Sequence, residues 1–111
     1  GLRAVGKTIE EAVWIFEQIK SFEEAGAWAV EVEVVPAQLL AEISKRTRLV
    51  TSSIGAGSGG DIQFMFAEDI LGCHAPPYPR HTKQYRDLYK MEQAIQVEQI
   101  SQAMVKFTFV K

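Results

Sequence analysis

The sequence predicts an α/β fold in which parallel strands alternate with helices. The hydrophobic spacing changes in the order helix, strand, helix, strand, loop, strand along the chain. Strands separated by helices of this length pair in parallel through right-handed crossovers. The third apolar run, residues 62–66, is nearly continuous, which is typical of a strand buried on both faces of a sheet. With 111 residues, we expect one domain spanning residues 1–111.

Composition excludes several classes of protein. The chain is 47% hydrophobic and 23% charged with a net charge of −2, so it is neither disordered nor suited by charge to bind nucleic acid. No apolar run approaches the length of about 18–20 residues that a membrane span needs. The single cysteine, Cys73, excludes an internal disulfide and indicates a reducing compartment. We therefore expect a cytoplasmic protein, or a mitochondrial one in a eukaryote, that binds neither nucleic acid nor membrane.

The first helix is predicted over residues 9–25. Thr8 and Glu11 have the spacing of a capping box, in which each side chain accepts a hydrogen bond from the other residue's backbone N–H. Gly26 follows at the position where a glycine commonly ends a helix. The apolar positions between these signals recur at helical spacing: Ala12, Val13, Phe16, Ile19, Phe22 and Ala25.

Two strands and a second helix follow. Residues 27–35 alternate valines with other residues, which predicts a strand that Pro36 ends. A helix is predicted over 37–46, with Leu39, Leu40 and Ile43 on its buried face, and a second strand over 49–54.

The glycine-rich segment 55–60 allows two interpretations. Gly55, Gly57 and Gly60 have the spacing of a dinucleotide-binding loop, but such a loop opens a helix, whereas here a strand follows within two residues. The alternative, a turn that needs left-handed backbone or close packing, is therefore favoured.

The C-terminal third is predicted to be irregular over 71–89 because of its glycine and prolines, then helical from Leu88, with a short strand over 105–111. His74 and His81 lie in the irregular part near Asp69, but their spacing matches no recognised set of metal ligands. We expect loop histidines and no metal ligand in this chain. Cys73 beside His74 is not expected to form a nucleophile–base pair.

Glu33 is the candidate catalytic residue. It lies at the carboxyl end of the first predicted strand, where parallel α/β proteins place their active sites. Valines flank it, so partial desolvation would raise its pKa and suit it to act as a general base. A solvated edge residue is the alternative. Glu31 lies on the same face; two inward carboxylates would be costly, whereas two outward ones would both be solvated.

The motifs around Glu33 resemble those of the ketopantoate hydroxymethyltransferase family. Residues 33–36, Glu-Val-Val-Pro, resemble the end of the family's Leu-Glu-Cys-Val-Pro strand, with Val34 in place of Cys. Further similarities occur in the same order along the chain: residues 1–6, 23–27, 54–57, Asp61 with Gln63, Asp69 with Gly72, and 79–85.

The resemblance implies the C-terminal portion of a (β/α)8 barrel of roughly 250 residues. It implies transfer of a hydroxymethyl group from 5,10-methylenetetrahydrofolate to 3-methyl-2-oxobutanoate, a small-molecule substrate, in pantothenate biosynthesis. Glu33 falls on the position of the proton-abstracting base. The family's Mg²⁺ ligands lie upstream of the positions matched here, so we expect this chain alone to be inactive. The family's assembly implies a homo-oligomer.

Several positions depart from the family pattern. Ser52 and Ser53 replace Ile and Gly, Glu31 replaces an apolar residue, Ile62 replaces Gly, and the family's C-terminal motif is missing from 103–111. Two alternatives therefore remain: a non-catalytic structural or assembly module of the same descent, and a different enzyme of the same barrel superfamily.

Overall fold

The structure, a computed structural model, describes residues 3–109, with side chains described up to residue 102. It divides into two compact units, Gly1–Phe64 and Met65–Lys111, which are treated separately below. The expectation of a single domain stays a prediction.

The first unit is a three-stranded parallel sheet with two helices. The strand order is β1-β2-β3, and both pairings are parallel. The predicted α/β class is therefore confirmed, while the sheet is open rather than closed into a barrel. The elements are α1 (Ile9–Glu24), β1 (Ala29–Glu33), α2 (Ala37–Ser44), β2 (Val50–Ile54) and β3 (Ile62–Gln63).

Helix α1 begins and ends at the predicted signals. The Thr8 hydroxyl accepts from the Glu11 backbone N–H at 3.2 Å, as expected for the N-cap. In the other half of the capping box, the Glu11 carboxylate accepts foremost from the backbone N–H groups of Gly6 and Lys7, with the Thr8 backbone as the weakest partner. Gly26 has φ +90° just beyond the helix, in the left-handed conformation that glycine adopts without steric cost.

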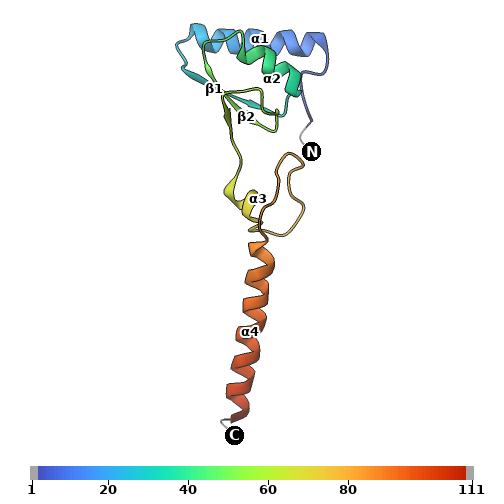
Figure 1. Ribbon diagram of the computed structural model, residues 1–111, viewed down its shortest axis with the longest axis vertical. Coiled ribbons are helices and arrows are strands. Elements are labelled where there is room, and N and C mark those ends of the chain that lie inside the picture. The colour runs from blue at the N-terminus through green and yellow to red at the C-terminus, as the bar shows by residue number, and fades with distance from the viewer. Residues whose placement is uncertain (1–2, 110–111) are drawn as a thin grey trace. The chain divides into compact units, whose positions relative to one another are not determined.

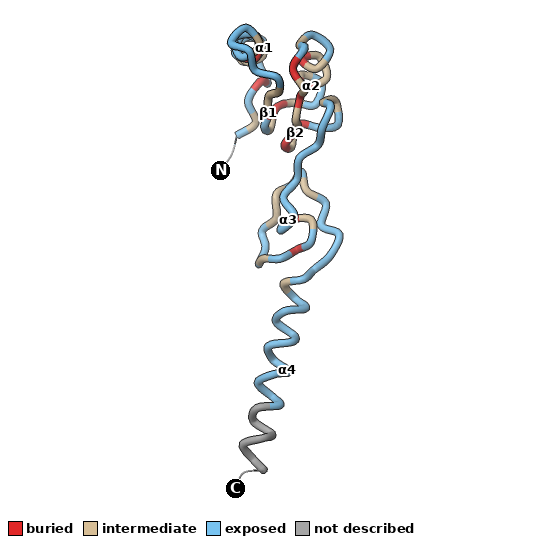
Figure 2. Tube along the Cα trace, turned by 90° about the vertical axis from the view of Figure 1, so that its left-hand side faces the viewer, coloured by how far each residue is buried: buried red, intermediate tan, exposed pale blue. Residues whose placement is uncertain are grey.

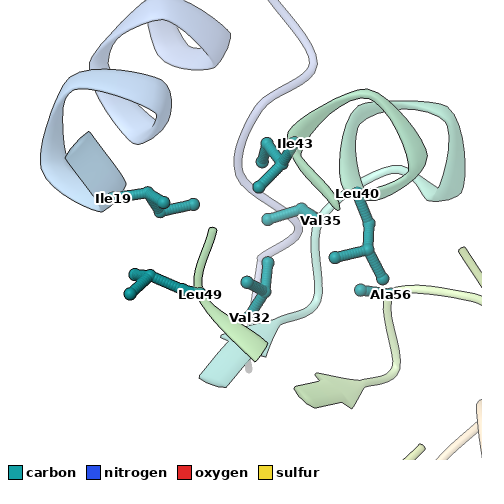
Figure 3. Close-up of a cluster of buried hydrophobic side chains, with 7 residues drawn as sticks. All are labelled: Ile19, Val32, Val35, Leu40, Ile43, Leu49 and Ala56. Carbon is teal, nitrogen blue, oxygen red and sulfur yellow. The ribbon is translucent and has the colours of Figure 1, made fainter. Parts of the chain in front are cut away.

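The core of this unit lies between the sheet and the two helices, which cover the same sheet face (Figures 1 and 2). Figure 3 shows Ile19 of α1 and Leu40 and Ile43 of α2 around Val32 of β1 and Leu49. Leu40 and Ile43 are fully buried, as predicted for the inner face of α2. Burying each such side chain contributes roughly 1.5–3 kcal/mol to stability, so this cluster anchors β1 from one side.

The third strand is shorter and more exposed than predicted. The expected strand over 62–66 is reduced to Ile62–Gln63, and Ile62 is 49% exposed. The expectation of burial on both faces is therefore wrong for this structure. A strand can be buried on both faces only when a layer covers each, and the described helices of this unit cover one face.

The second unit contains two helices joined by an irregular segment. Helix α3 (Ala67–Leu71) was not predicted; it is followed by the irregular chain that was expected, and then by α4 (Leu88–Phe109). The final helix is confirmed, but the predicted strand over 105–111 is wrong up to residue 109, where the backbone is helical. Residues 110–111 lie outside the described residues. Across the described residues, the helices are all too short or too polar to cross a membrane.

Candidate functional site

The candidate site is the edge of the sheet where β1 and β2 end. Glu33 is the last residue of β1 and pairs in register with Ile54, the last residue of β2. Gly55 follows directly, so Glu33 and the glycine-rich segment share one edge, as parallel pairing predicts. The proposed base therefore lies where parallel α/β proteins place their functional groups.

Glu33 and Glu31 lie on the sheet face opposite the helices. Val32 between them is 5% exposed and points into the core, whereas both glutamates are exposed. The desolvation predicted for Glu33 is not found, because the valines beside it do not cover its side chain. The structure thus favours the alternative in which both carboxylates are solvated. Ser52 is the register partner of Glu31 on β2, so two of the departures from the family pattern are neighbours in the sheet.

The backbone turns sharply at the residue after Glu33. Val34 has φ +51°, the only positive φ of a non-glycine residue in the described chain. Its N–H donates to the Ile54 carbonyl at 2.8 Å, and its carbonyl accepts from the Val5 N–H at 3.3 Å. Sequence reasoning missed this feature, since valine is among the residues least suited to the left-handed region.

The glycine-rich segment packs against α2. The Ser53 hydroxyl donates to the Gly57 carbonyl at 2.7 Å, and Gly57 has φ +83°. A Cβ on Gly57 would lie 2.6 Å from the Cβ of Ala37, and one on Gly59 would lie 2.9 Å from the Cα of Ala41. These glycines are required by close approach to a helix, which supports the turn interpretation over a nucleotide loop.

Asp61 fastens the start of β3 to β2. Its Oδ2 accepts from the backbone N–H and the hydroxyl of Thr51 at 2.8 and 2.9 Å, and Thr51 is fully buried. These hydrogen bonds, the backbone one foremost, lower the pKa of Asp61. The carboxylate that the resemblance singled out therefore has a structural role in this sheet.

An apolar groove of about 290 Å³ runs between α1 and the edge of β1 that does not contact β2. Trp14 and Phe22 of α1 line it and are about half exposed, at 57% and 47%. Val30 and Val32 line the strand side together with the two glutamates. The groove wall has no Lys or Arg, so it offers hydrophobic contact and backbone hydrogen bonding rather than an anion site.

In the second unit, His74 is paired with Asp69. The His74 Nε2 lies 2.9 Å from Asp69 Oδ1, and its Nδ1 lies 2.8 Å from the Ala75 carbonyl oxygen. Both ring nitrogens face acceptors, so the Asp69 carboxylate above all, and then the Ala75 carbonyl, raise the pKa of His74. The pair spans the end of α3. The sequence showed that Asp69 and His74 are five residues apart, but nothing in it indicated that the two side chains would be in contact. Cys73 is free and exposed.

The carboxylates of the described residues do not form a magnesium site. No group of three or more His, Cys, Asp or Glu side chains comes together in this part of the chain. Asp61 is bound to Thr51 and Asp69 to His74. The residues present thus do not fit the Mg²⁺ that the family resemblance implies.

The parallel sheet carries an exposed carboxylate where its strands end. This arrangement is typical of the class of α/β proteins whose functional groups lie at the carboxyl ends of the strands. Comparison with known proteins narrows this class. The family profile described as ketopantoate hydroxymethyltransferase matches residues 1–107 of the 111. The chain therefore belongs to the ketopantoate hydroxymethyltransferase family.

Curated relatives match over part of their own length. The 3-methyl-2-oxobutanoate hydroxymethyltransferase of Chloroflexus aggregans is 41% identical over 88 residues, which is 79% of this chain and 32% of the relative. The proteins of the same name from Streptomyces coelicolor and Clostridium novyi are 38% identical over 91 residues and 39% over 88. They are covered to 31% and 32% of their lengths, by 82% and 79% of this chain. The chain thus spans about a third of the length of the curated relatives it matches.

Proposed function

We propose that this chain supplies the general base, Glu33, to a 3-methyl-2-oxobutanoate hydroxymethyltransferase reaction. The observation that carries the proposal is the position of Glu33: an exposed carboxylate ending a parallel strand, inside the motif that resembles the family's catalytic strand. Family membership supports the substrate class, a branched 2-oxo acid, and the one-carbon donor, 5,10-methylenetetrahydrofolate.

The chemistry asked of Glu33 is a single proton transfer. Its carboxylate accepts the C3 proton of 3-methyl-2-oxobutanoate, and the electron pair of the broken C–H bond becomes an enolate. The enolate carbon then forms a bond to the one-carbon unit. A solvated carboxylate is a weak base, so this role requires that the remaining part of the active site cover Glu33 and raise its basicity. The described residues bring no cation beside it, and groups that balance the enolate charge must come from other parts of the enzyme.

We also infer that the open sheet is one part of a closed (β/α)8 barrel. Among the described strands β1 lies at one edge of the sheet, beside the apolar groove, so a further strand of the enzyme would pair its backbone with the outer edge of β1. Closure would cover the sheet face that carries Glu31 and Glu33, which no described helix of this unit covers. This supplies the enclosure that the open sheet lacks.

A chimera tests the proposed function. The matched 88-residue segment of this chain replaces the corresponding segment of the Chloroflexus aggregans enzyme, and formation of ketopantoate is measured. We expect a folded chimera with turnover comparable to that of its parent, because the segment keeps Glu33 and the turns that follow β1 and β2. A chimera with native secondary structure and cooperative melting but without product would contradict the proposal and favour the non-catalytic module.

A further inference from the structure

The conformation of Val34 is unusual for its residue type. A β-branched side chain at φ +51° crowds its own backbone, and such residues persist only where the surroundings hold them. Here the surroundings do so on both sides, through the hydrogen bonds of Val34 to Ile54 and Val5. The strain lies directly beside the residue to which the catalytic proton transfer is assigned.

The left-handed residue changes which side chains face the core. In a regular strand Val32 and Val34 would share one face and Glu33 and Val35 the other. Instead Val32 and Val35 are both buried, at 5% and 7% exposed, although they are three residues apart. Glu33 therefore lies between two anchored valines, and the turn at Val34 ends the strand immediately after it.

We propose that Val34 is a positioning residue for Glu33. The left-handed turn at Val34 is fixed between β2 and the segment before α1, and it sets where the Glu33 carboxylate projects from the end of β1. This inference rests on the proposed function, because it assigns the turn a role in proton transfer. A purely structural role, turning the chain into α2 and burying Val35, is the alternative that the experiment has to separate.

The test uses the chimera and measures exchange of the C3 hydrogen of 3-methyl-2-oxobutanoate with deuterated water by NMR, without the folate. Val34→Gly removes the crowded side chain and permits both signs of φ. We expect the melting temperature to stay level or rise by about 2–4 °C as strain is relieved. We expect kcat for exchange to fall about 10- to 100-fold, with KM unchanged, because the carboxylate is no longer held at a fixed place.

Two control variants separate positioning from structure. Val34→Cys restores the residue that the family resemblance places here and keeps a Cβ without branching, so exchange is expected to be retained. Gly26→Ala introduces strain at φ +90° at the far end of β1, where a Cβ would meet nothing within 4 Å. It should lower the melting temperature and leave the exchange rate unchanged.

The outcomes are distinguishable. Loss of kcat in Val34→Gly without loss of stability supports positioning. Unchanged kcat in Val34→Gly, or a fall in kcat only in proportion to lost folded protein, overturns it and leaves Val34 a structural turn. If Glu33→Gln exchanges as fast as the unsubstituted chimera, the proposed function itself has failed, whatever Val34→Gly does.

Discussion

At the scale of single residues, Glu23 joins the end of α1 to the turn before β2. Its carboxylate accepts from the Thr47 hydroxyl and from the Arg48 Nε, both at 2.7 Å. The Arg48 side-chain hydrogen bond first, and then that of Thr47, lower the pKa of Glu23 to about 2. These hydrogen bonds of Glu23 lie at the opposite end of β1 from Glu33. Removing them should therefore change the stability of the fold without changing the proton transfer proposed for Glu33.

Glu23→Gln should destabilise the fold at neutral pH, since the amide cannot carry the charge that Arg48 pairs with. The folded pKa is below the ordinary value of 4.5, so the charged pair stabilises the protein above pH 4.5 and its contribution disappears as pH falls towards 2. Urea unfolding at several pH values measures this: the difference between parent and variant should shrink across that window. A difference that is constant from pH 7 to pH 2.5 would show that charge is not the cause. Glu17→Gln, at an exposed site of the same helix, is the matched control.

At the scale of single residues, prediction from the sequence succeeded where the conformation and position of a residue follow the ordinary preferences of its type. Glu33 at a strand end and Gly26 at a helix end follow from general preferences, and both were found. Val34 could not be predicted, because its conformation contradicts its preference and is imposed by partners far along the chain. The exposure of Glu33 was one of two alternatives that the sequence left open, and the structure favours it because the flanking valines point away from the face that carries Glu33.

At the scale of elements, the pair of Asp69 and His74 ties the end of α3 to the irregular chain after it. The Tyr78 ring lies against the imidazole, with centroids 4.4 Å apart, and its hydroxyl donates to the His74 carbonyl. Gly72, which lies between Asp69 and His74 in the sequence, has φ +65° and ends helix α3. Helix α3 escaped prediction because five residues are too few to show helical periodicity.

Asp69→Asn should lower the titration midpoint of His74. The Asp69 carboxylate raises the pKa of His74 above 6.5, so the pair stabilises this unit fully below pH 6.5 and the contribution is lost as pH rises through the raised value. NMR of the imidazole nitrogens follows the titration directly. The same midpoint in parent and variant would mean that the pair does not form in solution.

At the scale of the whole molecule, prediction from the sequence reached the α/β class and the order of the elements of the first unit, but not the state of the sheet's edges. Periodicity reports which residues are apolar, and the continuous run 62–66 was apolar enough for a strand covered on both faces. Whether a second layer covers the other face of the sheet depends on other residues, about which the apolar run itself carries no information. Assembly into a homo-oligomer likewise stays a prediction.

This chain on its own should not exchange the C3 hydrogen of 3-methyl-2-oxobutanoate above a no-protein control. Glu33 is solvated, and no metal-binding cluster forms among the described residues, so a developing enolate would be as poorly stabilised as in water. The NMR exchange assay applies unchanged. Exchange well above the control would show that the described residues already contain a functional site.

The most direct measurement of the central claim compares Glu33→Gln with Glu31→Gln in the chimera. Both substitutions replace an exposed carboxylate by a near-isosteric amide on the same strand and the same face, roughly 6–7 Å apart. If Glu33 is the base, C3–H exchange falls by about 10²–10⁴-fold in Glu33→Gln and stays near the parent rate in Glu31→Gln, with both variants as stable as the parent. Equal exchange rates in Glu33→Gln and the parent would contradict the account.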